Sequence, residues 1–224
     1  MIDWGPFWLT GKLALLTTLL LVLLGIPLSY WLAYTKAKIK PVVETVVSLP
    51  LVLPPTVLGF YLLQTFSPTN PFGAWLKELF NVQLIFTFEG LVIASIIYSL
   101  PFMVQPIYSG LTHLPISLKE AAYCLGKSRS TTLLHVLLPN IKTSILTGIV
   151  LTFAHTIGEF GVVLMIGGNI PNTTKVASIA VYDEVEALNY ASANTYSIVL
   201  LAITFSILLL VYTINGGYLK RKVL

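Results

Sequence analysis

Long apolar runs separated by short polar connections dominate the pattern along the chain. Five of these runs, at about residues 9–34, 42–66, 88–111, 141–166 and 195–218, are long enough to cross a bilayer as helices. A crossing takes about 20 helical residues, and a helix satisfies its own backbone hydrogen bonds in lipid. We therefore predict an all-α integral membrane protein in which residues 1–224 form a single domain with five transmembrane helices.

Composition agrees with this pattern. Apolar residues make up 56% of the chain and charged residues 10%, whereas soluble domains average roughly 45–50% and about 25%. These values exclude a water-soluble globule. No stretch between the apolar runs exceeds about 30 residues, which is too short for a separate catalytic or ligand-capturing domain of usual size. Any chemistry that drives this protein is therefore expected to come from partners.

The basic residues predict the orientation of the chain. Loops rich in Lys and Arg stay on the cytoplasmic side of a membrane. Ten of the thirteen Lys and Arg residues lie in three segments: after the first run, after the third run and in the C-terminal tail. They are Lys36, Lys38, Lys40, Lys119, Lys127, Arg129, Lys142, Lys220, Arg221 and Lys222. We therefore expect the N-terminus outside and the C-terminus in the cytoplasm. The net charge of +4 follows from this topology and gives no support for a nucleic-acid partner.

Prolines and glycines interrupt several of the predicted spans. They are Pro27, Pro50, Pro54, Pro55, Pro101, Pro106, Gly148, Gly158 and Gly161. Each proline frees a backbone carbonyl that protein or water in a cavity must satisfy. Such interruptions suit a translocation pathway better than a passive anchor, although packed membrane helices also tolerate single prolines.

Residues 117–139 form the predicted cytoplasmic loop after the third run. The segment reads SLKEAAYCLGKSRSTTLLHVLLP, with two short helix-forming stretches on either side of Gly126 and a closing Pro139. Glycine at this position supplies a turn that other residues resist. A compact helical hairpin on rigid spans is suited to fit a groove on a partner and to pass motion into the membrane.

The spacing in this loop resembles that of a known family. Glu-Ala-Ala at 120–122, Gly126 and Val-Leu-Leu-Pro at 136–139 match the loop of binding-protein-dependent ABC importer permeases, with Val136 in place of the usual Ile. The resemblance implies that this loop is the coupling helix that docks on a separate ATPase subunit. The coupling residues it implies are Glu120, Ala121, Ala122, Gly126, Leu138 and Pro139. An ordinary interfacial amphipathic hairpin is the alternative.

The same loop contains a false nucleotide-binding pattern. Residues 121–128 read AAYCLGKS and end like a phosphate-binding loop, but that motif needs a glycine where Ala121 stands and a strand before it. We therefore expect ATP to be hydrolysed by another polypeptide. The chain itself is expected to be neither an enzyme nor the holder of a cofactor.

The fourth run carries ionisable residues at membrane depth, where they are candidates for function. His155 and Glu159 are four residues apart, which predicts one helical face shared with Thr152 and placed near Gly161. This polar stripe is interpreted as lining the pathway or a gate, with Glu159 bonded to His155 or to a second copy. A hydrogen bond that only fixes helix packing is the alternative. A metal site would need a third ligand, so none is expected.

Beyond the loop, most of the chain resembles the molybdate branch of these permeases. The matching segments are residues 49–63, 86–94 and 158–187, although Asn172 and His155 stand where the branch usually has Gly and a basic residue. The resemblance implies an importer of molybdate or tungstate in a bacterial inner membrane. It also implies a homodimer with two ATPase subunits and an external binding protein. A sulfate or thiosulfate permease, an ion-coupled secondary transporter and a membrane enzyme are the alternatives.

Overall fold

The computed structural model describes residues 2–215, and every regular element in this range is a helix. Three helices are individually long and apolar enough to cross a membrane, namely α1 (Gly5–Tyr34), α5 (Phe88–Thr112) and α12 (Tyr190–Asn215). At 1.5 Å per residue, α1 is about 45 Å long and spans a bilayer together with its headgroup regions. The number of candidate spans rises to five when each of two bent helix pairs counts as one.

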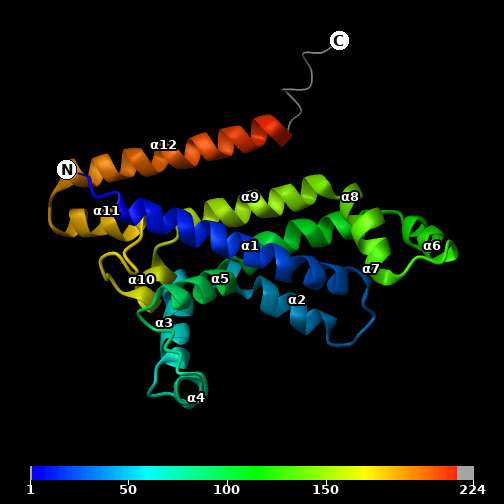
Figure 1. The fold of residues 1–224 in the computed structure, drawn as a ribbon, viewed down its shortest axis with the longest axis horizontal. Coiled ribbons are helices and arrows are strands. Elements are labelled where there is room, and N and C mark those ends of the chain that lie inside the picture. Colours follow the sequence, from blue (N-terminus) through cyan, green and yellow to red (C-terminus); the bar gives the residue numbers. More distant parts are fainter. Residues whose placement is uncertain (1, 216–224) are drawn as a thin grey trace, which may run out of the picture.

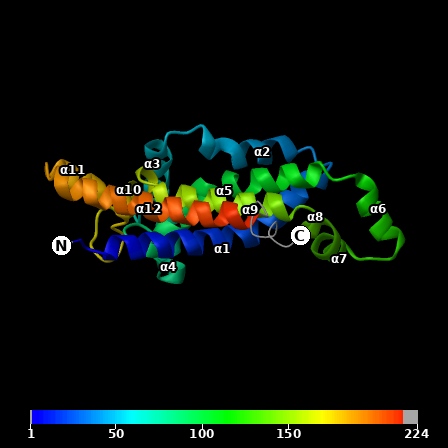
Figure 2. The same cartoon turned by 90° about the horizontal axis from the view of Figure 1, so that it is seen from above.

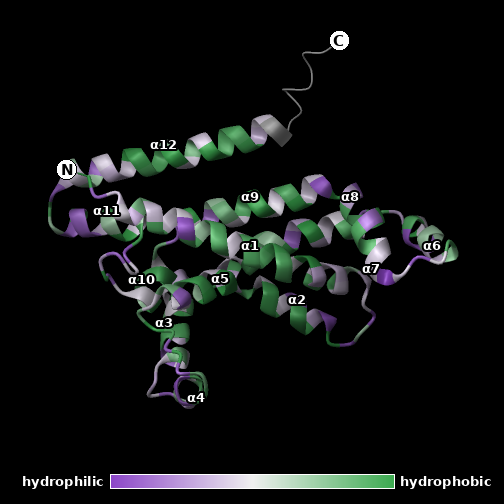
Figure 3. Cartoon of the chain, in the orientation of Figure 1, coloured by the Kyte–Doolittle hydropathy of each residue, from purple (hydrophilic) through white to green (hydrophobic). Residues whose placement is uncertain are grey.

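The long helices run side by side along the molecule. α1 and α5 pack closely on each other and on α9 (Lys142–Gly158), whereas α12 lies over this group with fewer contacts (Figures 1 and 2). Apolar residues colour these helices over most of their length, while polar residues gather toward their ends (Figure 3). This distribution is what a bilayer selects, since apolar side chains then face lipid as well as the core.

The second predicted span is not one continuous helix. α2 (Lys40–Ser48) and a 3₁₀ turn (Leu49–Leu51) lead into α3 (Pro55–Phe66), which leaves at an angle of 112°. Pro54 precedes α3 in an extended conformation, and two successive prolines supply no backbone donors to continue α2. As a result, α3 and the following α4 (Pro71–Phe80) project away from the long helices (Figure 1).

The fourth predicted span is also divided. α9 ends at Gly158, and α10 (Gly161–Gly167) begins after the two-residue link Glu159–Phe160. The interruption predicted at Gly158 and Gly161 is therefore present, and residues 141–166 do not form one continuous helix. α10 packs against α3 and α5, so the breaks in the second and fourth spans meet in space. The fifth predicted span ends at residue 218, outside the described residues, as do Lys220, Arg221 and Lys222.

The predicted hairpin is present. It consists of α6 (Ile116–Cys124), α7 (Arg129–Thr132), a π-helical turn (Leu133–Leu137) and α8 (Leu138–Asn140), and Gly126 lies between α6 and α7. It occupies the end of the molecule opposite the N-terminus (Figure 1). Leu137 is fully buried in one core cluster with Leu21 of α1 and Met103 of α5. The hairpin is therefore mounted rigidly on the two central helices.

The opposite end is closed by α11 (Ala177–Glu186), which packs on α12 and α1. Tyr196 of α12 stacks on Phe7 with ring centroids 5.6 Å apart, and its hydroxyl accepts a hydrogen bond from the Asp3 amide at 3.0 Å. Asn169 donates to both carboxylate oxygens of Asp183, which also pairs with Lys175. These contacts fix the N-terminus, α11 and the start of α12 as one cap.

Candidate functional site

A cavity of about 490 Å³ lies where the two helix breaks meet. It is bordered by the start of α3, by α5, by the end of α9 and by the start of α10. The residues that line it are Pro55, Thr56, Tyr98, Ala154, His155, Gly158, Glu159, Phe160 and Gly161. Three of the four predicted pathway residues, His155, Glu159 and Gly161, are thus brought to one cavity. The fourth, Thr152, is buried but does not line it.

Glu159 is 5% exposed and lies just beyond the end of α9, with an extended backbone. Its Oε2 accepts a hydrogen bond from Ser95 Oγ at 3.1 Å, and its main-chain oxygen accepts one from Ser178 Oγ at 2.6 Å. Oε1 has no hydrogen-bond partner among the described residues. Because α9 stops at Gly158, the expectation that His155 and Glu159 share a helical face is wrong, although both border the cavity.

His155 is held by α5 rather than by Glu159. Its Nδ1 lies 3.0 Å from Ser99 Oγ, and its ring packs between Phe102 and Tyr98 at centroid distances of 4.0 and 4.7 Å. Ser95 and Ser99 are one helical turn apart on α5 and are both fully buried, so they present two hydroxyls toward the end of α9. Neither serine is among the site residues predicted from the sequence. The sequence feature that points to them is the i, i+4 spacing of two serines inside an apolar run.

The polar groups around this cavity do not gather as a metal site would. Within residues 2–215, no three His, Cys, Asp or Glu side chains lie together in a metal-binding arrangement. The carboxylate of Glu159 and the imidazole of His155 each take a serine hydroxyl as their partner. This arrangement positions helix ends and shapes a cavity.

Gly161 lets α10 approach α3. A Cβ added to Gly161 would meet Pro55 Cβ at 2.8 Å, whereas one added to Gly158 would meet nothing within 4 Å. We expect Gly161→Ala to lower stability by about 1–3 kcal/mol, as overpacking does, and to reduce transport. Gly158→Ala is the matched control and should change both little. Thermal unfolding in detergent and uptake measure the two effects, and equal behaviour of the two variants would contradict this account.

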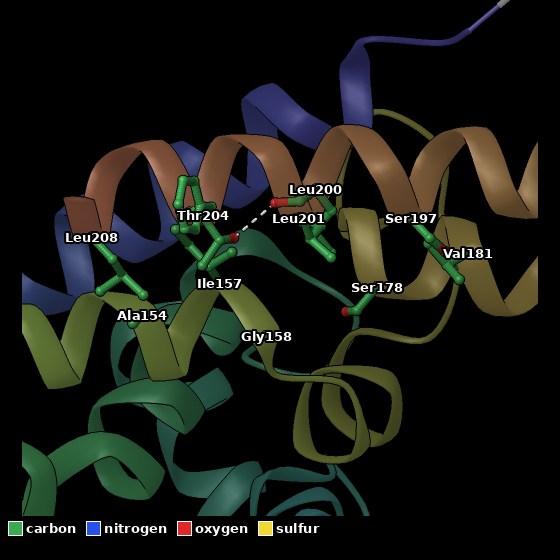
Figure 4. Close-up of a pocket in the computed structure, with 11 residues that line it drawn as sticks. Ala154, Ile157, Gly158, Ser178, Val181, Ser197, Leu200, Leu201, Thr204 and Leu208 are labelled. Atoms are coloured by element: carbon green, nitrogen blue, oxygen red, sulfur yellow. Dashed lines mark hydrogen bonds between the residues drawn. The ribbon is translucent and has the colours of Figure 1, made fainter. Parts of the chain in front are cut away.

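A larger cavity, of about 660 Å³, lies on the other side of α9, against α12. Figure 4 shows Thr204 and Leu208 of α12 pointing toward Ala154 and Ile157 of α9 across it. Most of its lining is apolar. Ala154 and Gly158 border both cavities, so the last turn of α9 separates one cavity from the other.

The hairpin tip has a defined backbone geometry. Gly126 adopts φ +72°, and the amides of Gly126 and Lys127 donate to the carbonyls of Tyr123 and Ala122. This pair of bonds is the Schellman motif that ends a helix. Ser128 then caps α7 by accepting a hydrogen bond from the Thr131 amide at 3.2 Å.

The predicted coupling residues lie on both arms of this hairpin. Ala122 is packed inside it, whereas Glu120, Ala121, Gly126 and Pro139 are exposed and Leu138 is half-buried. At the tip, Leu125 is 77% exposed. Its side chain is therefore available to contact a partner.

Residues 25–224 match the family described as the binding-protein-dependent transport system inner membrane component. The chain belongs to this family. The permease is 45% identical to the molybdenum transport permease ModB of Azotobacter vinelandii, covering 94% of this chain and 93% of that one. It is 32% identical to the putative molybdenum permease YvgM of Bacillus subtilis, with 91% and 89% covered. A probable sulfate permease, cysT of Prototheca wickerhamii, is 34% identical, with 95% and 83% covered.

Two solved transporters share the fold of this permease. The MetNI methionine ABC transporter, in an inward-facing conformation, matches with a TM-score of 0.73 at 16% identity, with 95% of this chain and 94% of that one covered. A bacterial ABC transporter for the polysaccharide alginate matches with a TM-score of 0.75 at 18% identity, with 98% and 80% covered. The predicted all-α permease fold is thereby confirmed.

Membership of the family fixes the role of the permease at a coarse level. It is an inner membrane component, a translocation subunit rather than an enzyme, and it works with an ATPase and a substrate-binding protein. The resemblance found in residues 120–139 is therefore confirmed at the level of the family. The individual roles of the coupling and cavity residues stay predictions.

Proposed function

We propose that this permease imports a tetrahedral oxyanion, molybdate or tungstate. The observation that carries the proposal is the 45% identity to a molybdenum permease over nearly the full length of both chains. The sulfate permeases match at 31–36% identity, which makes sulfate the second candidate. Neither the cavity at Glu159 nor the hairpin distinguishes these dianions, so discrimination is assigned mainly to the binding protein.

The orientation proposed from the basic residues is supported by their placement. α6, α7 and the loop with Lys36 and Lys38 lie at one end of the molecule, and Asp183 lies in the cap at the other (Figure 1). We place the hairpin end in the cytoplasm and the N-terminal cap outside, in accord with the retention of Lys and Arg. The binding protein would then dock on the segment 183–186, which carries the acidic residues Asp183, Glu184 and Glu186.

We further propose that two copies form the transporter, with the pathway between them. The projecting α3 supports this because Phe60 and Tyr61 are 52% and 59% exposed and Gln64 is exposed beside them. Two ATPase subunits would dock on the two hairpins, residues 117–139 of each copy. ATP-driven approach of the hairpins would swing the spans between inward-open and outward-open states.

Glu159 is assigned a gating or packing role in this cycle. A carboxylate repels a dianion at short range, so direct anion binding is disfavoured. Its bond to Ser95 connects the link between α9 and α10 to α5, which suits a joint that holds or releases the two half-helices. The cavity opens beside this joint.

Competition uptake tests the substrate. Cells that carry the permease, its ATPase and its binding protein should accumulate radiolabelled molybdate, and unlabelled tungstate should compete at similar concentration whereas sulfate should need at least tenfold more. Matched cells that lack only the ATPase should show no concentrative uptake. Equal competition by sulfate would move the assignment to the sulfate branch. Uphill uptake without the ATPase would instead indicate a secondary transporter.

A further inference from the structure

A polar cavity of about 390 Å³ lies between the last turn of α1 and the hairpin. It is separate from both cavities described above. Its lining combines aromatic rings with two cationic side chains, and consists of Tyr30, Trp31, Tyr34, Thr35, Lys119, Tyr123 and Arg129. Because α1 and α6 both contribute, any ligand here would contact the long helix and the hairpin together.

Lys119 is held in this cavity by aromatic faces. Its Nζ lies 3.9 Å from the ring centroid of Tyr34 and 5.8 and 5.9 Å from those of Tyr123 and Tyr30. The hydroxyls of Tyr30 and Tyr123 are 3.4 Å apart and join α1 to α6. Rings attract an ammonium group through their quadrupoles, but they carry no charge. Lys119 is therefore positioned without being neutralised.

Arg129 adds a second positive charge to the same cavity. Among the described residues, no Asp or Glu side chain lines it, and neither Lys119 nor Arg129 belongs to an ion pair there, since the two that occur involve Lys40 and Lys175. Two cations around a cavity that no carboxylate lines favour an anionic ligand. Guanidinium and ammonium groups together are the donors that bind phosphate oxygens.

The depth of the cavity indicates where this anion comes from. α1 is about 45 Å long, so its last turn emerges from a hydrocarbon core of about 30 Å into the headgroup layer. Tyr and Trp side chains are typical of that layer. Trp31 is 37% exposed at the edge of the cavity and would face the first carbons of an acyl chain. A soluble ion would leave this apolar edge uncovered.

We propose that this cavity binds the phosphate headgroup of an anionic phospholipid from the cytoplasmic leaflet, an inference that rests on the orientation proposed above. Arg129 and Lys119 hold the phosphate oxygens, and Trp31 covers the upper acyl chain. The lipid bridges α1 and α6 at the base of the hairpin. It thereby stiffens the connection through which an ATPase moves the spans.

The test measures lipid retained by the intact transporter complex. The complex is reconstituted in nanodiscs of phosphatidylcholine with phosphatidylglycerol, washed in detergent, and its lipids are counted by mass spectrometry. The wild type should retain about one phosphatidylglycerol more per permease than Lys119→Gln/Arg129→Gln, with preference for the anionic lipid falling roughly fivefold for each removed charge. Lys36→Gln/Lys38→Gln, which removes two charges from the same end but outside the cavity, should behave as the wild type.

Three outcomes would overturn the proposal. They are equal retention in the cavity variant, an equal loss in the Lys36/Lys38 control, and displacement of the lipid by a molar excess of inorganic phosphate, which would identify a soluble anion as the ligand. Should the double variant not assemble, Arg129→Gln and Arg129→Lys replace it, and only the former should lose lipid. Oxyanion uptake is not a readout here. A negative result thus leaves the proposed transport function intact.

Discussion

Replacing Gly126 with valine is expected to uncouple the permease from its ATPase while leaving it folded in the membrane. Gly126 has φ +72°, a left-handed conformation, and a side chain there would meet nothing within 4 Å. The cost is therefore backbone strain, about 1–2 kcal/mol for an ordinary residue and more for a β-branched one. Relief of that strain breaks the Schellman bonds that end α6 and displaces Leu125. ATPase co-purification and uptake should each fall at least tenfold.

The variant Gly126→Asn distinguishes the effect of backbone strain from the effect of simply replacing the glycine. Asparagine adopts left-handed backbone conformations far more readily than valine, so this variant should retain most of the association and uptake. Membrane insertion, measured by yield and by gel filtration in detergent, should be the same for both variants because Gly126 contacts no span. Unchanged ATPase association in Gly126→Val would show that the turn does not position the docking surface.

The hairpin was predictable from the sequence because its determinants are local. Gly126 ends one helix, Ser128 caps the next, and Leu137 belongs to an apolar surface that any packed arrangement buries. Turn and cap preferences depend on a few neighbouring residues. The same locality explains why the first and third predicted spans lie close to the bounds of α1 and α5, which continue through Pro27, Pro101 and Pro106.

The two helix breaks were only partly predictable. Hydropathy measures how apolar a run is and gives no direction to the backbone, so residues 42–66 and 141–166 each predict one transmembrane span whose interruptions are marked only by prolines and glycines. The prolines marked the first break, but its 112° angle depends on packing far along the chain. A Cβ on Gly59 of α3 would meet Met165 Cβ of α10 at 2.8 Å. A close approach between a glycine and a residue far away in the sequence leaves no periodic pattern in the sequence.

The serine partners of the cavity cannot be recognised from the sequence for a related reason. Ser95 and Ser99 lie in an apolar run where a hydroxyl usually bonds to its own helix backbone. Their role depends on α9 ending opposite them, at Gly158. His155 and Glu159 are predictable as candidates because ionisable groups at membrane depth are costly. The hydrogen-bond partners of these two side chains depend on how the helices pack in the tertiary structure.

Glu159 is expected to act through the hydrogen bond that its side chain accepts rather than through its charge. Within the described residues it takes part in no ion pair, and its contact is with Ser95 Oγ. Glu159→Gln keeps an acceptor oxygen in the same place, so stability and uptake should change little. Glu159→Leu leaves the fully buried Ser95 hydroxyl without this partner, which costs about 1–3 kcal/mol, and frees the link between α9 and α10. Uptake by this variant should fall at least tenfold.

A double-mutant cycle assigns this loss to the Ser95 contact. Ser95→Ala combined with Glu159→Leu should destabilise the permease by less than the sum of the single changes, because either substitution alone already removes the bond. Ser29→Ala is the matched control: Ser29 is equally buried but donates to Val104 O, so its effect should add to that of Glu159→Leu. Thermal unfolding of the wild type, the two single variants and the double variant in one detergent gives the coupling energy of each cycle. If Glu159→Gln proves as damaging as Glu159→Leu, the charge itself is required and the joint must be an electrostatic one.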